Sequence, residues 1–363
     1  MYLQRMKIEK EMNQLMKKRI SALLFAMLIA LTAFAHAEDP RVFVDDVGRE
    51  VELDAAIERV IVTGQLGQTA VFAIAPEKLV GLVSAWDKAA QPYIDTETYN
   101  LPVLGQIYGG KGNANLEEML AAQPQVVIDI GEPKDGLAAD LDALQAQTGL
   151  PFVHISAYTN RLDETYMRLG ELLGMPEEGR MLSEYCTRVY ARAQEIAQQA
   201  QKVRLLYVVG VEGLGVIAKD SYHSTVIDMF ADNVAVLESP SSKGTGNEVD
   251  MEQILIWNPD VVLFSESSIF ETAGEDPLWQ AVSAIESGRY YDVPVGPYNW
   301  MGVPPGVQQL LGMMWMGKLL YGDLADYDLY EETAQYFELF YHSELSREQY
   351  DALVAGSIGR LSH

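Results

Sequence analysis

The chain is poor in cysteine, histidine and basic residues. Its 363 residues include one cysteine, five histidines, and 26 Lys and Arg against 52 Asp and Glu, which gives a formal net charge of −26. A single thiol cannot build a disulfide framework. The negative charge repels phosphate backbones and anionic lipid, so it argues against nucleic-acid binding and peripheral membrane binding.

Motifs of common enzyme classes are also missing. The chain has no His-Glu-x-x-His sequence and no Walker motif. Gly210, Gly213 and Gly215 follow a strand pattern, but their spacing is the reverse of the Gly-x-Gly-x-x-Gly typical of dinucleotide sites. We therefore predict that the protein is not an enzyme and has no resident cofactor.

Residues 1–37 have the features of an export signal. Lys17-Lys18-Arg19 precedes an apolar run over 20–34, and Ala35-His36-Ala37 matches a small-x-small cleavage site. About 15 apolar residues are too few for a membrane span, which needs roughly 20. We predict a signal peptide that is cleaved before Glu38, with Met1 or Met16 as the start. No cysteine near its end could carry a lipid, so an unlipidated periplasmic protein is expected.

A 15-residue pattern occurs twice, 135 positions apart. Asn115–Asp129 and Asp250–Phe264 both have an Asx residue, a Leu/Met-Glu pair, a short helical pattern, a proline and a buried strand pattern. Glu118 and Gln253 stand where a capping box would have its partner. A helix leading into a buried strand is typical of a parallel sheet. The period is too long for a solenoid, so we expect two similar α/β lobes.

The helical pattern between the repeats predicts a connecting rod. Pro176 stands at a helix start, and the pattern continues from Glu177 to about Lys202, roughly 39 Å at 1.5 Å per residue. Core strands are expected over 59–63, 78–83, 152–155 and 204–209. The predicted organisation is a signal peptide (1–37), an N-terminal α/β lobe (38–175), an interlobe helix (176–202) and a C-terminal α/β lobe with a helical tail (203–363). The tail, 322–363, is expected to pack on the second lobe.

Several sequence segments, taken together with their order along the chain, resemble those of one protein family. Beside the paired Leu/Met-Glu motifs stand Asp276-Pro-Leu-Trp279, Arg289-Tyr-Tyr-Asp-Val-Pro294 and the terminal Leu-Leu-Tyr321. Over about 41–321 the chain resembles the periplasmic binding proteins of ABC importers for iron chelates (siderophores), haem and cobalamin. The resemblance implies an α/β fold of two Rossmann-like lobes joined by a long rigid helix, with a ligand cleft between them. It also implies a monomer whose partner is a permease–ATPase complex in the inner membrane.

The same resemblance suggests a docking surface. In the family one exposed glutamate per lobe meets arginines of the permease, and the matching positions here are Glu117 and Glu252. A carboxylate in the first helical turn also favours the helix dipole by about 0.3–1 kcal/mol. Since Glu118 and Gln253 stand at the capping-box position, the cap does not require Glu117 and Glu252, and docking is the favoured role.

Candidate ligand-binding residues follow from the rule that loops at the carboxyl ends of strands line the cleft. Aromatic faces suit a large chelate or macrocycle, and Tyr or His can complete a metal's coordination shell. His223 is a possible metal ligand of this kind, whereas His154 stands in a strand pattern and is expected in the core. Lys219 and Asn299 are expected to hydrogen-bond an anionic ligand. The predicted cleft residues are Trp86, Tyr108, Lys219, Tyr222, His223, Tyr298, Asn299 and Trp300.

Other ligand classes stay open. A naked Zn or Mn ion held by several histidines would have to use His154, His223 and the tail residue His342. Oxyanion binding by loop donors near Lys219–Ser224 and Lys243–Gly246 is the second candidate. A sensor of the same fold, coupled to a receptor, is the third. The particular metal complex is not determined by the sequence.

Overall fold

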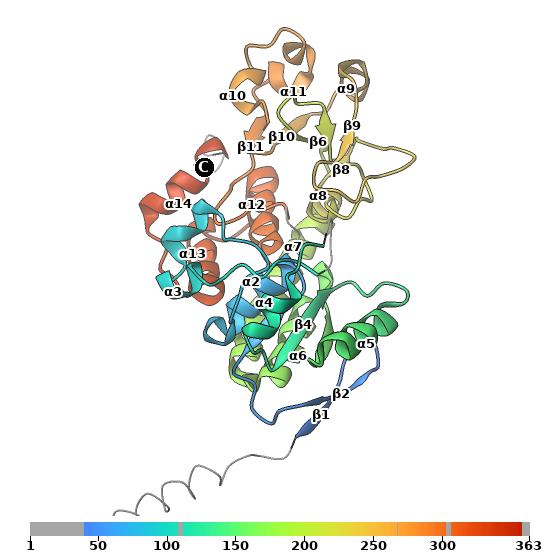
Figure 1. Ribbon diagram of the computed structural model, residues 1–363. Helices are drawn as coiled ribbons and strands as arrows, with labels where there is room; N and C mark the ends of the chain where they lie inside the picture. The colour runs from blue at the N-terminus through green and yellow to red at the C-terminus, as the bar shows by residue number, and fades with distance from the viewer. Residues whose placement is uncertain (1–39, 108–111, 267, 303–305, 358–363) are drawn as a thin grey trace, which may run out of the picture.

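The computed structural model describes residues 40–107, 112–266, 268–302 and 306–357 (Figure 1). The predicted signal peptide over 1–37 and the candidate Tyr108 lie outside these residues. The chain forms two α/β lobes, as expected: in Figure 1 the first lies at the bottom and the second at the top, with α7 and α12 between them. In the part of the chain that is described, no helix is both long and apolar enough to cross a bilayer.

The first lobe is built on a parallel sheet in the order β3-β4-β5. Its strands are buried runs of branched residues, the pattern of a sheet covered on both faces. The segment predicted as a strand over 78–83 forms only isolated bridges, from Leu79 to Val60 and from Leu82 to Val103. The elements are β1 (Arg41–Val44), β2 (Glu50–Leu53), β3 (Val60–Val62), α2 (Gln65–Ile74), η1 (Pro76–Lys78), η2 (Lys88–Tyr93), α3 (Thr96–Tyr99), α4 (Leu116–Ala121), β4 (Val126–Gly131), α5 (Leu137–Thr148), β5 (Phe152–Ser156), η3 (Thr159–Arg161) and α6 (Leu162–Leu173).

The second lobe has a mixed sheet in the order β11-β10-β6-β7-β9, with β8 also paired to β6. β6, β10 and β11 are parallel, and β7 and β9 continue the sheet in antiparallel fashion. The elements are β6 (Arg204–Val209), β7 (Gly215–Val216), α8 (Thr225–Phe230), β8 (Asp232–Asn233), β9 (Asn247–Glu248), α9 (Met251–Trp257), β10 (Val261–Phe264), α10 (Phe270–Ala273), η4 (Trp279–Ala281), α11 (Ser283–Glu286), β11 (Tyr290–Asp292) and α12 (Gln309–Tyr321).

The connecting helix α7 (Pro176–Gln199) has 24 residues and spans about 36 Å. It begins at the predicted proline and ends three residues before the predicted Lys202, because the backbone turns extended at Ala200 on its way into β6. A Cβ at Gly179 would lie 2.7 Å from the carbonyl oxygen of Tyr166, so this glycine allows α6 and α7 to approach closely. The free thiol of Cys186 is buried, and burial raises its pKa.

The tail corrects one expectation. Instead of packing only on the second lobe, α13 (Leu329–Tyr341) crosses to the first lobe, where the Phe340 ring lies 5.6 Å from that of Tyr166 in α6. The same ring lies 5.4 Å from that of Tyr185 in α7. Glu332 accepts hydrogen bonds from arginines of α7, one of them Arg188 at 2.7 Å. The chain then returns through α14 (Arg347–Leu353) and η5 (Ala355–Ser357), which packs beside β11. The aromatic stripe of α13 finds its apolar partner surface on α2, α6 and α7.

One continuous apolar core runs through both lobes. It includes Val62 and Ile155 of the first sheet, Ile196 of α7, Leu205 of the second sheet and Trp315 of α12. Two smaller cores lie on the outer faces of the two sheets. Because the lobes share packed side chains through α7, α12 and α13, the fold favours small movements of one lobe against the other.

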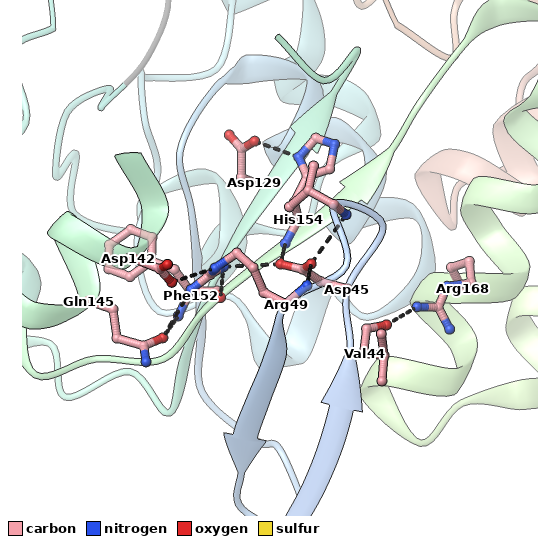
Figure 2. Close-up of polar contacts among 10 residues, drawn as sticks. Val44, Asp45, Arg49, Asp129, Asp142, Gln145, Phe152, His154 and Arg168 are labelled. Atoms are coloured by element: carbon pink, nitrogen blue, oxygen red, sulfur yellow. Dashed lines mark hydrogen bonds and ion pairs between the residues drawn. The ribbon is translucent and has the colours of Figure 1, made fainter. Parts of the chain in front are cut away.

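A buried polar network holds the β1–β2 hairpin against the first sheet (Figure 2). Asp45 accepts a hydrogen bond from the backbone nitrogen of His154 at 3.3 Å and forms an ion pair with Arg49 at 3.0 Å. His154 is fully buried, with Nδ1 2.7 Å from Asp129 Oδ2, and the Thr63 hydroxyl donates to the same carboxylate. His154 is therefore a core residue, as predicted.

Candidate ligand cleft

A cavity of about 630 Å³ opens between the two lobes. Its walls come from loops that leave the carboxyl ends of strands: Gln65 follows β3, Glu266 follows β10, and the segment 295–299 follows β11. This is the edge at which open parallel sheets bind ligands. The lining residues are Gln65, Ser84, Ala85, Trp86, Asp87 and Lys88 from the first lobe and Glu266, Val295, Pro297, Tyr298 and Asn299 from the second.

Two of the predicted aromatic residues, one from each lobe, lie next to each other in the wall of this cavity. The rings of Trp86 and Tyr298 have centroids 6.4 Å apart and are tilted by 42°. Phe72 supports Trp86 from behind with an edge contact at 5.1 Å, and the indole nitrogen of Trp86 donates to the Thr98 carbonyl at 3.3 Å. These contacts hold the two rings in place, so the cavity has rigid apolar walls from both lobes.

A polar chain joins the lobes beside the rings. Gln65 Nε2 of the first lobe donates to the Tyr298 hydroxyl of the second at 3.2 Å, while Gln65 Oε1 accepts from the Ser84 hydroxyl at 3.1 Å. Burial raises the pKa of Tyr298 to about 12, so its phenol is neutral at physiological pH. The hydrogen bond between Gln65 and Tyr298 thus links the two lobes across the cavity.

Asn299, predicted to hydrogen-bond an anionic ligand, instead orients an acidic group. Its side-chain nitrogen donates to Glu266 Oε2 at 2.8 Å and lies 3.1 Å from the Tyr207 hydroxyl, and its oxygen accepts from the Met301 backbone nitrogen at 2.9 Å. Glu266 was not among the predicted residues. Its position directly after the β10 strand pattern and Ser265 is the signal that would have identified it.

A second carboxylate, Asp292, lies behind Glu266 at the end of β11. Desolvation by burial, together with the charges of Glu266 and Glu271, raises its pKa to about 6. Its Oδ1 is buried and has no hydrogen-bond partner among the described residues. Glu266 in the second-lobe wall of the cavity therefore has a second acidic group, Asp292, nearby.

Three other predicted cleft residues do not line this cavity. Trp300 is fully buried, and its indole nitrogen donates to the Gly296 carbonyl at 3.1 Å. His223 is also buried, with Nδ1 3.0 Å from the Gly302 carbonyl oxygen, and Lys219 pairs with Asp232 at 3.5 Å. Each side chain already has a partner within the second lobe.

Tyr222 lies at a smaller hollow elsewhere on the seam between the lobes. This hollow has a volume of about 20 Å³ and is lined by Tyr222 together with Glu132, Thr159, Gly306 and others. Beside it, the Thr159 hydroxyl donates to Gln309 Oε1 at 2.6 Å, a second polar contact between the lobes. The structure thus brings Trp86, Tyr298 and Asn299 together and places Tyr222 apart from them.

The proposed docking glutamates have matching surroundings in the two lobes. Glu117 in α4 and Glu252 in α9 are both exposed in the first helical turn. Neither carboxylate forms an ion pair with any described residue. The Asn115 side chain caps α4, but its backbone nitrogen donates to Leu104, so Glu118 does not complete a capping box.

Two α/β lobes, a connecting helix and a cavity walled by both lobes define a ligand-binding protein of the cleft type. The chain belongs to the periplasmic binding protein family, whose sequence profile matches residues 83–295. The resemblance drawn from the sequence motifs and the α/β fold class are thereby confirmed. A search of curated proteins found no match to this chain.

Solved structures share the fold. An ABC transporter solute-binding protein from Sulfurospirillum deleyianum is 22% identical, with a TM-score of 0.78 over 87% of this chain and 99% of its own. A periplasmic solute-binding protein from Veillonella parvula is 24% identical, with a TM-score of 0.74 over 89% and 99%. The molybdate periplasmic binding protein MolA of Haemophilus influenzae, solved with molybdate, is 20% identical, with a TM-score of 0.65 over 84% and 99%.

Proposed function

We propose that the protein is the solute-binding component of an ABC importer and that it captures a metal complex such as an iron–siderophore chelate, haem or cobalamin. The cavity between the lobes carries this proposal. Its volume of about 630 Å³ lies within the roughly 300–1,000 Å³ typical of small-molecule sites and far exceeds the space a single ion needs. The Trp86 and Tyr298 rings, one from each lobe, give the cavity wall an apolar part that suits a large, partly apolar ligand.

In this proposal the protein works in the periplasm after removal of the signal peptide, as an unlipidated monomer. It performs no bond chemistry. The ligand binds between the lobes, the lobes close slightly around it, and the complex docks on a permease in the inner membrane. The apolar core shared by both lobes supports a small closure.

An oxyanion such as molybdate or tungstate is the second candidate, because MolA shares the fold and was solved with molybdate. The lining residues favour it less. An oxyanion site needs donors and positive charge, yet Lys88 stands among Asp87 and Glu266.

Titration of intrinsic fluorescence tests the proposal. Trp86 in the cavity wall should be quenched by a coloured metal complex, so the purified protein is titrated with ferric siderophores, haemin, cobalamin and molybdate. Quenching by one metal complex at submicromolar concentration, lost in Trp86→Leu, supports the proposal. A response to molybdate alone would replace the metal-complex function with the oxyanion function. No change in fluorescence with any compound would contradict both functions.

Docking is tested separately from binding. Because Glu117 and Glu252 are exposed and do not line the cavity, Glu117→Ala combined with Glu252→Ala should bind ligand with unchanged affinity while uptake into cells falls at least about tenfold. The matched control is Glu118→Ala combined with Gln253→Ala, one position further along the same two helices. Normal uptake by the first pair, or equal loss in both pairs, would reject the docking assignment.

A further inference from the structure

We propose that the cleft selects metal complexes that are neutral or carry a net positive charge, and discriminates against anionic complexes. This inference rests on the proposed function and narrows the substrate class of the same cavity. Its starting point is the set of charged residues in the cavity wall, which is Asp87, Lys88 and Glu266. The positions of these three charges decide which sign the ligand meets.

Glu266 is the charge that the fold holds in place. Asn299 donates to Glu266 Oε2 at 2.8 Å, and Asn299 is itself fixed by its contacts with Tyr207 and the Met301 backbone nitrogen. Only one carboxylate oxygen takes part in a hydrogen bond with the described residues, and the side chain is exposed to the cavity. A preorganised acceptor of this kind stabilises a positive group without further ordering of the protein.

The charges at the first-lobe wall are less constrained and oppose each other. Asp87 accepts a hydrogen bond from the Ala89 backbone nitrogen at 2.8 Å, so its carboxylate caps the start of η2. Lys88 is exposed at the same turn, at the end of a flexible four-carbon chain. A solvated ammonium beside a carboxylate has a weak net field, so Lys88 does not outweigh Glu266.

The neighbouring groups act in the same direction. Asp292 lies close enough to Glu266 for the two carboxyl groups to interact, which adds to the negative potential on this side of the cavity. The protein as a whole carries a formal charge of −26, which concentrates cations near its surface and repels anions. A complex with a pendant ammonium group, or one with no net charge, meets complementary surroundings in this cavity.

The test compares complexes that differ only in charge. Ferrioxamine B has a free ammonium; its N-acetyl derivative is neutral and its N-succinyl derivative is anionic, while the iron coordination is identical. We expect the ammonium form to bind about tenfold more tightly than the succinyl form, with the acetyl form between them. Glu266→Gln keeps an acceptor for Asn299 but removes the charge, so the ratio of the Kd of the succinyl form to that of the ammonium form should fall towards one. Glu271→Gln is the control, because Glu271 does not line the cavity.

A second series of ligands tests the charge preference with other classes of metal complex. Cationic aquacobalamin and neutral cyanocobalamin are titrated beside two anionic complexes, ferric enterobactin and haemin. Tighter binding of an anionic complex, or a charge ratio that Glu266→Gln leaves unchanged, overturns the charge inference while the proposed function stands. Absence of binding by every complex in both series overturns the proposed function, and the inference falls with it.

Discussion

Replacement of Asp292 by asparagine should stabilise the protein at neutral pH. The carboxyl group has a folded-state pKa of about 6 against an ordinary value of 3.8, because burial and the nearby Glu266 disfavour its ionised form. Two pKa units correspond to about 3 kcal/mol. Since Asp292 is partly exposed, solvent screening reduces the expected effect to about 1–2 kcal/mol.

The pH window follows from the direction of the shift. Below about pH 4 Asp292 is protonated in both the folded and the unfolded chain, and its charge costs nothing. Between about pH 4 and pH 6 the folded chain binds more protons than the unfolded one, so stability falls as the pH rises. The gain in stability from Asp292→Asn should therefore be absent near pH 4, grow between pH 4 and pH 6, and be complete above about pH 6.

Thermal melts at pH 4.5, 5.5, 6.5 and 7.5 measure this difference. At pH 7.5 we expect Asp292→Asn to raise Tm by about 2–4 °C. Asp323→Asn removes an exposed carboxylate outside the cavity and should leave Tm nearly unchanged at every pH. A gain of equal size at pH 4.5 and 7.5, or a loss at pH 7.5, would refute the electrostatic explanation.

Two further substitutions test the contacts between the lobes. Tyr298→Phe removes the hydroxyl that accepts from Gln65 but keeps the ring, so urea melts should show that the free energy of unfolding falls by about 1 kcal/mol. When Gln65 has already been replaced by alanine, adding Tyr298→Phe should cause no such fall. Phe340→Ala should cost about 3–5 kcal/mol, because this buried ring packs against Tyr166 of the first lobe and Tyr185 of the connecting helix; a cost below about 1 kcal/mol would show that the tail is peripheral.

Much of the fold was predictable because its signals are local. The helical pattern located α7 to within three residues, and the repeat located α4–β4 and α9–β10. The segment over 78–83 has a strand pattern but forms only isolated bridges, since strand pairing depends on a neighbour that the local pattern cannot specify.

The candidate site was less predictable. Trp86, Tyr298 and Asn299 line the cavity, because each stands after a core segment and loops at the carboxyl ends of strands converge. His223 and Trp300 stand in comparable loops, yet their side chains turn into the second lobe. A rotation about one or two side-chain bonds decides between the cavity and the core, and no sequence pattern records it.

By itself the sequence determined the two-lobed α/β design, the connecting helix and the family, since repeats, caps and motif order are properties of neighbouring residues. Only the tertiary structure decided that α13 packs on the first lobe, that Asn299 holds Glu266, and that Gln65 reaches Tyr298 across the cavity. Each of these contacts joins residues far apart in the chain, and its partner is chosen by the packing of the whole fold.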